Sequence, residues 1–455
     1  MQLLRRPCVV LVLFTTLVPF ATTAFAQTWD RPLANGMTFR MEVQRDPVRT
    51  IYGIRWDPKQ IRAESRLAGG RIYEPGAYNG RGFVSALVND AHGVAGFNGD
   101  FFQWTPDPGG DPTGFMLSRG TLLSGTGRGD RGWAWVWSES GLPQVAQPEV
   151  RVSLQTSAGD WAATTLNGKV APGGLGVSFE VAGEIYGAGP LTAWVLDLGG
   201  KPPTNPGRLQ ATVREVRRDV ARMAIVPGTA VVAGDGPWTE RLAAGKVGDQ
   251  VTIDVAIDGL AEGMAEGMGG GPHLLKDGVY AGPDEPANAP RHPRTAVGKT
   301  PDGAIWAVVV DGRQSMSVGA TFRETADILR RWGCSDALNL DGGGSSTLHA
   351  MGVTLNRPSG GSERPVANGV VLFTRQPRPG IATEVSLQAP VSMRVGEEAV
   401  VGLTGAPGNE VVWTAQGTAW IDQDGRLRAF APGKVVVTAL VRARVVRAEI
   451  DILTP

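Results

Sequence analysis

The residues best suited to chemistry in this 455-residue chain gather at positions 339–347, where the sequence runs Asn-Leu-Asp-Gly-Gly-Gly-Ser-Ser-Thr. Three consecutive glycines let a backbone approach a ligand closely and expose N–H groups to an anion. Asp341 places a carboxylate at the edge of this turn, and Ser345 and Ser346 add hydroxyl groups. The run is neither a Walker motif nor a dinucleotide-binding fingerprint, because it lacks their lysine and glycine spacings. A tight turn between strands is the alternative interpretation.

Further charged residues could complete a site for an anionic substrate. Asp311, Glu324 and Glu363 supply carboxylates elsewhere in the chain. Arg294 could hold a phosphate through two parallel hydrogen bonds, although a solvated surface arginine is the commoner outcome. Two of the carboxylates also have structural explanations. Glu324 stands three residues after Thr321, as in a helix capping box, and Glu363 lies in a polar loop.

The histidine pattern does not favour a zinc site. After the N-terminal segment the histidines are His92, His273, His292 and His349, and no two of them have the spacing of a zinc pair. Calcium or magnesium at Asp341 is chemically allowed, because both ions take oxygen ligands. No cofactor is expected.

Two strands and a helix are needed to position these residues. The apolar run at 304–310 predicts a buried strand that ends at Asp311, and residues 336–340 predict a second strand that ends at Asp341. Between them, the capping box at Thr321 predicts the start of a helix. Because sites in α/β sheets form beyond the carboxyl ends of strands, both aspartates are well placed to act.

Three other segments carry weaker local patterns. Residues 79–92 place apolar side chains on one helical face, which predicts an amphipathic helix. Residues 96–102 contain an Asn-Gly pair that suits a hairpin turn. The glycine- and methionine-rich run at 263–271 is expected to be a loop near the site.

Composition and the start of the chain limit the classes of function. Lys and Arg number 44 and Asp and Glu also number 44, a balance that argues against nucleic acid as a partner. Arg5 and Arg6 precede an apolar run at 9–20, and an Ala-x-Ala pattern ends before Gln27. Residues 1–26 are therefore expected to be a cleaved export signal, which predicts a secreted or periplasmic protein without a membrane span after processing.

The residue pattern changes after residue 375. Residues 376–380 are rich in Pro and Gly and are expected to form a linker, and residues 381–455 contain short β-type runs separated by turn residues. These runs resemble bacterial Ig-like modules. The fold class predicted for the whole chain is α+β: a catalytic domain at 27–375 with a mixed sheet and helices, followed by a small all-β Ig-like sandwich.

Several motifs together resemble the phosphodiester glycosidase family. They are the segments 98–102, 271–274, 294–298, 310–313, 319–324 and 339–347, in this order. The segment 356–368 resembles the bacterial branch in particular. The resemblance covers roughly residues 90–375, and the ensemble is more specific than any one of its parts.

The resemblance implies hydrolysis of the anomeric C–O bond of a sugar-1-phosphodiester, such as an N-acetylglucosamine-1-phosphodiester. Such a transition state needs a carboxylate for its oxocarbenium character, and cations and N–H groups for the departing phosphate. The implied catalytic candidates are Asp341 first and Asp311 second, followed by Glu324 and Glu363. The implied substrate-binding residues are Asn98, Gly99, His273, Arg294, Arg313, Asn339, Gly342, Gly343, Gly344, Ser345, Ser346 and Arg364.

Two other functions compete with this hypothesis. The protein could be a phosphodiesterase that breaks P–O bonds in envelope polymers, or a carbohydrate-binding envelope protein without catalysis. The substrate expected under the main hypothesis is a phosphodiester of a cell-envelope, capsule or exopolysaccharide glycan. Neither the anomeric outcome nor the oligomeric state follows from the sequence.

Overall fold

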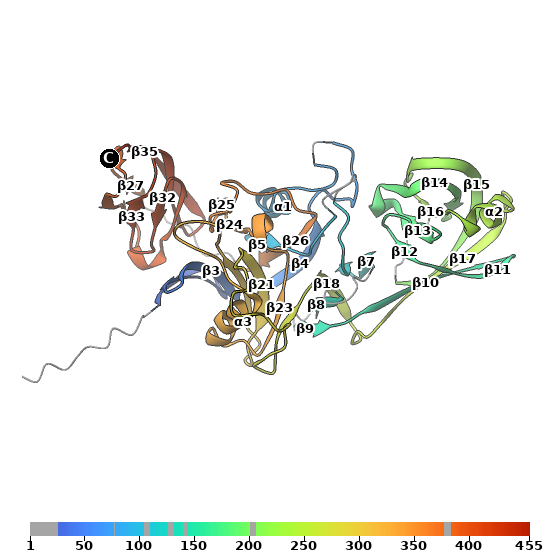
Figure 1. Ribbon diagram of the computed structural model, residues 1–455, viewed down its shortest axis with the longest axis horizontal. Helices are drawn as coiled ribbons and strands as arrows, with labels where there is room; N and C mark the ends of the chain where they lie inside the picture. Colours follow the sequence, from blue (N-terminus) through green and yellow to red (C-terminus); the bar gives the residue numbers. More distant parts are fainter. Residues whose placement is uncertain are drawn as a thin grey trace, which may run out of the picture.

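The computed structural model describes residues 26–76, 78–103, 110–125, 132–139, 143–200, 206–376 and 384–455. The expected export signal and most of the expected linker lie outside these residues. Three parts follow one another along the long axis (Figure 1). We call them the C-terminal module (384–455), the body (the described residues of 26–146 and 264–376), and the lobe (149–258).

The body is built around an eight-stranded sheet, here called sheet 1. Its order is β1 (Gln27–Ala34), β2 (Met37–Arg45), β3 (Val48–Trp56), β22 (Ile305–Val310), β21 (Arg294–Lys299), β23 (Asp336–Asn339), β19 (His273–Lys276) and β20 (Val279–Tyr280). Both β22 and β23 pair antiparallel with β21, which lies between them. The two strands therefore point the same way, and the residues that follow them meet at one edge of the sheet.

A second sheet packs face to face on sheet 1. Sheet 2 has the order β25 (Val353–Thr354), β24 (Leu348–Ala350), β5 (Ala95–Asn98), β26 (Asn368–Thr374) and β4 (Ile61–Leu67). The shared core joins Val309 and Leu338 of sheet 1 to Phe97 and Val370 of sheet 2. Residues 95–98 are thus an inner strand of sheet 2, and the expected hairpin turn is not formed there.

Helices cover the outer faces of the two sheets. The helix α3 (Phe322–Arg331) packs on sheet 1, and β22 is buried on both faces because Trp306 and Val308 meet this helix while Val309 meets sheet 2. The predicted capping box at Thr321 is present with both of its hydrogen bonds. The helix α1 (Val84–Asp90) covers sheet 2 as its apolar pattern predicted.

A third sheet joins the body to the lobe and corrects one expectation. Sheet 3 has the order β7 (Thr121–Ser124), β6 (Met116–Ser118), β18 (Met264–Gly270), β8 (Trp133–Ser138) and β9 (Pro143–Ala146). The run at 263–271, expected to be a loop, forms the central strand β18, so that expectation was wrong. Its glycines leave room for close neighbours, since a Cβ at Gly267 would collide with the Phe115 ring and one at Gly269 with the Asp100 carboxyl.

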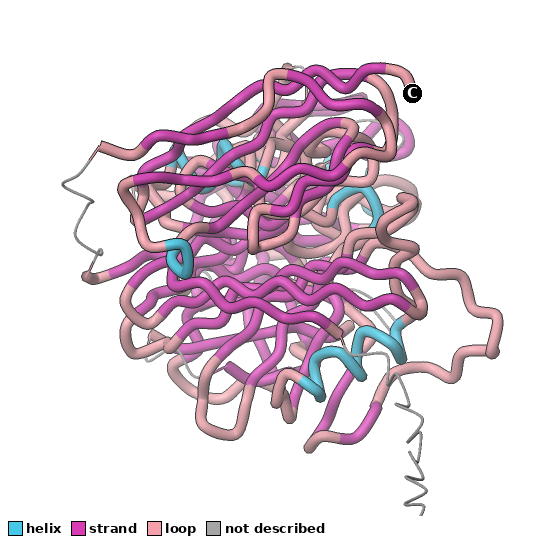
Figure 2. The backbone as a smooth tube through the Cα atoms, turned by 90° about the vertical axis from the view of Figure 1, so that its left-hand side faces the viewer, coloured by secondary structure: helices cyan, strands magenta, loops and turns pink. Residues whose placement is uncertain are grey.

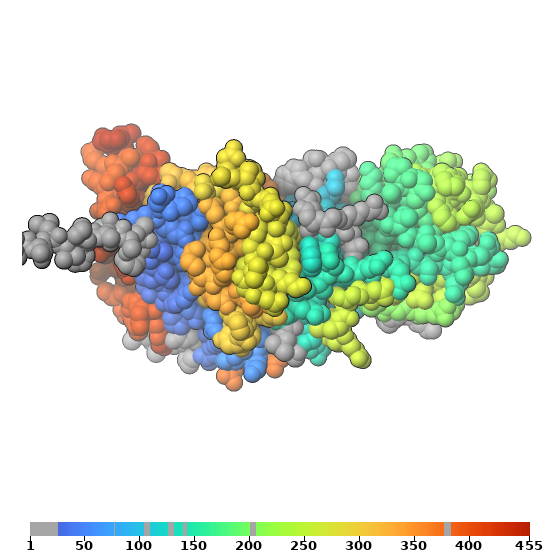
Figure 3. Space-filling model, turned by 60° about the horizontal axis from the view of Figure 1, so that its bottom comes forward, coloured from blue at the N-terminus to red at the C-terminus, as the bar shows by residue number. Residues whose placement is uncertain are grey.

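The lobe has a sheet and cores of its own, which the sequence did not separate from the body. Its order is β11 (Gly159–Ala163), β10 (Glu149–Thr156), β17 (Gln250–Asp258), β15 (Gly207–Ala224), β14 (Glu184–Asp197), β16 (Thr229–Gly234), β13 (Leu175–Phe179) and β12 (Thr165–Leu166). The helix α2 (Pro237–Ala243) and the 3-10 turn η2 (Glu180–Ala182) complete it. The lobe forms one end of the elongated surface, opposite the C-terminal module (Figure 3).

The C-terminal module is all-β, as its short runs predicted. Its three small sheets are β27 (Ser386–Gln388) with β30 (Gly402–Thr404); β28 (Ser392–Arg394), β35 (Arg444–Leu453), β34 (Gly433–Val441) and β31 (Val412–Gly417); and β29 (Glu398–Val400), β33 (Arg426–Ala429) and β32 (Ala419–Ile421). A 3-10 turn, η4 (Gly408–Glu410), precedes β31.

The module is joined closely to the body. Val412 and Leu440 belong to the same apolar core as Trp29. The Arg31 guanidinium donates to the carbonyls of Val411 at 3.2 Å and Gln423 at 2.7 Å. The module therefore shares a core with the first strand of sheet 1.

Strands dominate the backbone (Figure 2), at 53% against 8% helix. In sheets 1 and 2 the strand pairs of the described residues are antiparallel. A parallel pair occurs in the lobe, where β12 pairs with β13, so the part of 27–375 with a mixed sheet is the lobe and not the sandwich. The helices are confined to outer layers. Within the described ranges, no helix has the length and apolar character needed to span a membrane.

Candidate active site

The glycine-rich run begins where β23 ends and is fastened to the end of β5. The backbone N–H of Asp341 donates to the carbonyl of Gly99 at 3.0 Å. The side-chain amide of Asn98 donates to the carbonyl of Asp341 at 2.7 Å. Because β5 belongs to sheet 2 and β23 to sheet 1, these bonds close the edge of the sandwich and fix the backbone at Asp341.

The Asn98 side chain makes hydrogen bonds within the protein and does not face a sugar site. Its side chain is completely buried. Its Oδ1 accepts from the Thr295 hydroxyl at 2.8 Å and from the Thr347 N–H at 3.1 Å. Since both ends of the amide are engaged, Asn98 positions the turn, and the role of sugar partner expected for it has no support in this geometry.

The turn itself is a 3-10 helix, η3 (Gly343–Ser345). Some of the backbone N–H groups expected to bind an anion donate to backbone carbonyls here. The N–H of Gly343 donates to the carbonyl of Pro293 at 2.8 Å, and that of Ser345 donates to Gly342 at 3.2 Å. Gly343 has a φ of 62°, which suits glycine. Within the described turn at 341–346, the amides of Gly342 and Gly344 are the two without a backbone carbonyl acceptor.

Two guanidinium groups flank the turn. A Cβ added to Gly344 would collide with the Arg364 guanidinium, and one added to Gly343 would lie 3.4 Å from Nη2 of Arg313. The glycines thus allow cations to lie directly against the backbone. Arg313 also approaches Nδ1 of His292 at 3.3 Å. The pKa of His292 is lowered by burial and by the nearby Arg294 and Arg313, which keeps its ring neutral.

Four buried oxygen atoms of this run lack hydrogen-bond partners among the described residues. They are Oδ1 of Asn339, Oγ of Ser345, Oγ of Ser346 and Oγ1 of Thr347. Buried polar side chains in folded proteins are nearly always hydrogen-bonded. Four such atoms within nine consecutive residues indicate a place where a polar ligand or water completes the structure.

Arg294 lies at the start of β21, between the ends of β22 and β23. Its Nε donates to the carbonyl of Ala320 at 2.9 Å, and its guanidinium carbon lies 3.9 Å from the centre of the Phe322 ring. Burial lowers its pKa to about 10, so it is still a cation at neutral pH. With Nε engaged, the two Nη groups are the ones that could hold an anion.

Asp311 follows β22 but does not join the glycine turn. Its carboxylate accepts from Nδ2 of Asn356 at 3.1 Å and from the N–H of Arg357 at 3.1 Å, and the side chain is buried. Burial raises its pKa to about 7. Asn356 also donates to the carbonyl of Ser346 at 3.0 Å. Asp311 therefore supports the turn from behind, one residue removed.

The other two carboxylate candidates are engaged in structural contacts. Glu324 closes the capping box of α3 and pairs with Arg49 at 2.9 Å and with Arg291 at 2.8 Å. Burial opposes ionisation of Glu324, but the hydrogen bonds and charges of these partners lower its pKa overall. Glu363 accepts from the N–H of Ser85 at 3.1 Å and from the Thr354 hydroxyl.

Two more predicted residues lie just behind the turn. His273 is buried, with its ring 4.8 Å from that of Trp133, and burial lowers its pKa. Its partner in the sheet is Leu338, next to Asn339. The amide of Asn339 donates to the carbonyl of Gly271 at 2.8 Å, which ties β23 to the end of β18. Both residues shape the floor below the turn.

Asp100, which the sequence patterns did not indicate as a site residue, lies beside the turn. Asp100 is buried, and its N–H donates to Oδ1 of Asn368 at 2.8 Å. Its carboxyl lies against Gly114 and Gly269, where any Cβ would collide with it. Two glycines that make room for one carboxyl would have been the signal, but they lie far from it in sequence. Asn368, which starts β26, was also not selected.

The described residues around the turn do not form a cluster of metal ligands. Over the described ranges, no group of three or more His, Cys, Asp or Glu side chains is arranged to hold an ion. The polar groups at the turn are the Asp341 carboxyl, hydroxyls, amides and guanidiniums, which suit a sugar and an anion.

Comparisons with known proteins agree with this chemistry. Residues 207–373 match the family described as phosphodiester glycosidase. A stretch of 82 residues is 38% identical to the SPbeta prophage-derived uncharacterized protein YomE of Bacillus subtilis; it makes up 18% of this chain and 13% of that protein.

Two of the similar solved structures share the fold. A hypothetical protein from Synechocystis superposes with a TM-score of 0.60 at 19% identity, over 75% of this chain and 62% of its own. A Burkholderia pseudomallei protein named as an exported protein gives a TM-score of 0.59 at 22% identity, over 71% of this chain and 74% of its own. The zebrafish N-acetylglucosamine-1-phosphodiester alpha-N-acetylglucosaminidase catalytic domain gives only 0.39 at 15% identity, over 77% and 88% of the two chains.

Proposed function

We propose that the protein hydrolyses the anomeric C–O bond of sugar-1-phosphodiesters, because residues 207–373 match the phosphodiester glycosidase family. The observation that carries the proposal is the set of four unpartnered buried oxygens at 339–347, next to a carboxylate and two guanidiniums. A sugar supplies hydroxyl donors for such oxygens, and a phosphodiester supplies an anion for such cations.

The phosphate side of the substrate is assigned to Arg313 and Arg364 at the glycine turn, with the Nη groups of Arg294 nearby in the sheet. A phosphate that departs from the anomeric carbon gains negative charge, and cations aimed at it lower the barrier. Gly342 and Gly344 bring two backbone amides to the same place. Because a phosphate monoester leaves readily, strong help from a general acid is less essential than in ordinary glycosidases.

Asp341 is the residue that we assign to the anomeric carbon. Its backbone is clamped by Gly99 and Asn98, so its position is fixed, and its residue is only partly buried. A carboxylate there can stabilise an oxocarbenium ion or attack it. Asp311 is less suited, because its oxygens already accept hydrogen bonds and burial raises its pKa to about 7.

Hydrolysis in ¹⁸O-labelled water tests the bond that is cleaved. With N-acetylglucosamine-1-phosphate methyl ester as substrate, we expect ¹⁸O in the released sugar and none in methyl phosphate. Label in the phosphate would support a phosphodiesterase. Binding without any turnover, measured by calorimetry on the same compound, would support a carbohydrate-binding protein instead.

We extend the proposal to location and natural substrate. An exported enzyme that starts at Gln27 would meet cell-envelope or capsule glycans, and the name of the Burkholderia relative is consistent with export. The C-terminal module would then be an Ig-like spacer or glycan contact. Mass spectrometry of the protein outside the cytoplasm should find Gln27 as the first residue, and retention of Arg5 and Arg6 there would contradict processing.

A further inference from the structure

A cavity of about 550 Å³ lies at the edge of the sandwich opposite the glycine turn. Ile305, which begins β22, lines it, whereas Asp311 follows the other end of the same strand. Likewise, Ala265 and Glu266 near the start of β18 line it, whereas Gly269 near the strand's end lies at Asp100. The volume is within the range of small-molecule sites, roughly 300–1,000 Å³.

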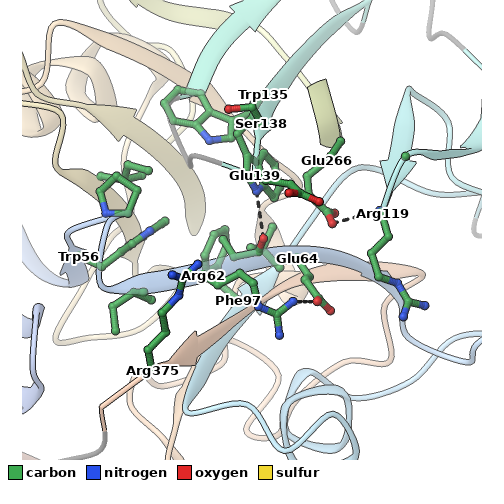
Figure 4. A pocket seen from close by; sticks show the side chains of 18 residues that line it. Trp56, Arg62, Glu64, Phe97, Arg119, Trp135, Ser138, Glu139, Glu266 and Arg375 are labelled. Carbon is green, nitrogen blue, oxygen red and sulfur yellow. Dashed lines mark hydrogen bonds and ion pairs between the residues drawn. The ribbon is translucent and has the colours of Figure 1, made fainter. Parts of the chain in front are cut away.

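The interior of this cavity is aromatic. Trp56, Phe97, Trp135 and Trp137 line it, and each is at most 4% exposed. In Figure 4, Trp56 lies on the left-hand side of the cavity, Trp135 lies at the top, and Glu266 and Arg119 lie on the right. The ring centres of Trp56 and Phe97 are 6.2 Å apart. Indole faces of this kind favour a flat apolar body.

Polar groups inside the cavity are few, and most are engaged. The indole N–H of Trp137 donates to the carbonyl of Ala63 at 3.0 Å. The Glu266 carboxylate accepts from Ser65 and from the N–H of Arg119. Among the described residues, the indole nitrogen of Trp56 is buried without a partner. A sugar ring would bury several hydroxyls here without partners, at a cost of about 1–3 kcal/mol each, so an apolar body with a single acceptor fits better.

Cations gather at the rim. Arg62, Arg119 and Arg375 line the mouth and are exposed, and Glu139 is the exposed carboxylate beside them. Arg62 is paired with the buried Glu64, which also accepts from Arg66 at 2.6 Å. Among the described residues, neither Arg119 nor Arg375 forms a salt bridge, although the charge of Glu266 acts on Arg119. The pKa of Arg62 is lowered by burial and by the repulsion of Arg66, Arg375 and Arg119, a crowding that an anion would relieve.

We propose that this cavity is a second binding site, separate from the glycine turn, for an amphipathic anion. The apolar or aromatic body of the ligand lies between Trp56, Phe97 and Trp135, and its anionic group lies at the mouth beside Arg119 and Arg375. An acceptor atom on the body meets the indole N–H of Trp56. This inference does not depend on the proposed glycosidase activity.

Two probes of the same body test the site in the full-length protein. The first is 8-anilinonaphthalene-1-sulfonate and the second is N-phenyl-1-naphthylamine, which lacks the sulfonate. Binding is measured by fluorescence titration, with excitation of tryptophan to detect energy transfer. We expect the double variant Arg119→Glu/Arg375→Glu to weaken binding of the sulfonate about five- to tenfold, in keeping with exposed charge pairs, and to leave the neutral probe unchanged.

Two further variants serve as controls. Arg214→Glu changes an exposed arginine of the lobe and should leave both probes unaffected. Ala265→Trp fills the cavity and should abolish binding of both, and a thermal unfolding curve shows that each variant is folded. Equal affinity of the sulfonate for the double variant and Arg214→Glu would overturn the anion subsite. The cavity would be overturned as a site if both probes bound folded Ala265→Trp as they bind the parent protein, or if neither probe bound the parent. Tighter binding of methyl glucoside than of either probe would overturn the amphipathic ligand and assign the cavity to sugars.

Discussion

Asp311 and Asp341 follow two strands that point the same way in sheet 1, yet they end in opposite environments. Asp311 is buried, and its carboxylate accepts from Asn356 and Arg357. Asp341 is partly exposed, and its backbone, not its side chain, makes the contacts with Asn98 and Gly99. The Asp311 carboxyl stabilises the backbone around it, whereas the backbone of Asp341 is itself held in place by Asn98 and Gly99.

The two regions are linked through Asn356. This residue donates to Asp311 at 3.1 Å and to the carbonyl of Ser346 at 3.0 Å. The end of β22 thus acts as the support for the turn at the end of β23. Sequence position alone makes the two aspartates equivalent, and burial separates their roles. Changes at Asp341 should therefore affect rate, and changes at Asp311 should affect stability.

The largest effect is expected for Asp341→Asn, which keeps the shape and removes the charge. On the proposed mechanism, kcat for a sugar-1-phosphodiester should fall on the order of 10³-fold. The melting temperature should stay near that of the parent, because the substitution leaves the backbone contacts of Asp341 with Gly99 and Asn98 in place. Near-normal kcat would show that Asp341 is a turn residue.

Arg294→Ala should have the next largest effect. Loss of a charge-assisted contact to phosphate is expected to lower kcat/KM for a phosphodiester about 10- to 100-fold. Arg294→Lys keeps the charge but loses the planar fork, so its loss should be smaller. An aryl glycoside without phosphate is the matched control substrate. If both substrates suffer equally, the contacts of Arg294 with Ala320 and Phe322 are structural and the phosphate is held by Arg313 and Arg364.

Asp311→Asn tests the other side of the comparison through pH. The pKa of Asp311 is about 7 in the folded protein and ordinarily 3.8, so the folded state keeps a proton that the unfolded chain loses. Its contribution to stability is therefore complete below about pH 4 and is lost as pH rises to 7. The variant should lack this component of the fall in melting temperature and should retain activity within tenfold.

Asp111→Asn is the matched control for this measurement, because burial raises the pKa of Asp111 to about 7 as well. It should also flatten the pH dependence of the melting temperature. A parent protein whose stability rises between pH 5 and 7, with the rise removed by Asp311→Asn, would contradict the raised pKa.

The smallest effect is expected for Gln416, which contacts Asn356 from the side of the C-terminal module. Gln416 of the C-terminal module donates to the carbonyls of Asn356 at 2.9 Å and Thr354 at 3.3 Å. Gln416→Ala should lower kcat about two- to fivefold without a matching change in KM, in proportion to a neutral hydrogen bond. Lys434→Ala, on the exposed surface of the same module, is the control. Equal kcat in both variants would show that the module does not position the turn.

Local patterns predicted the elements that depend on neighbours in sequence. The capping box and apolar face of α3, the two strands that end at Asp311 and Asp341, and the all-β C-terminal module follow from spacing within a few residues. The match of residues 207–373 to the phosphodiester glycosidase family was also predicted, because the motifs that carry it are short segments.

The features that the sequence did not reveal depend on distant contacts. Glycines in β18 suggested a loop, since composition shows flexibility but not that Asp100 and Phe115 need the space. Asn98 suggested a ligand contact, but its partners come from Thr295, Asp341 and Thr347. The lobe was missed for a related reason. Its hairpins β10–β11 and β14–β15 are local, but the pairs β10–β17 and β13–β16 that complete its sheet join strands far apart in sequence.

The bonds between Arg31 and the C-terminal module carry a consequence for how the molecule is made. Arg31 and Val411 are 380 positions apart in the chain, and Met41 and Gln423 are 382 apart. At about 5–20 residues per second, the partners of the first strand are synthesised roughly 20–80 seconds after it. During that interval β1 has one face without its final cover, so its packing is completed only by residues that are made much later.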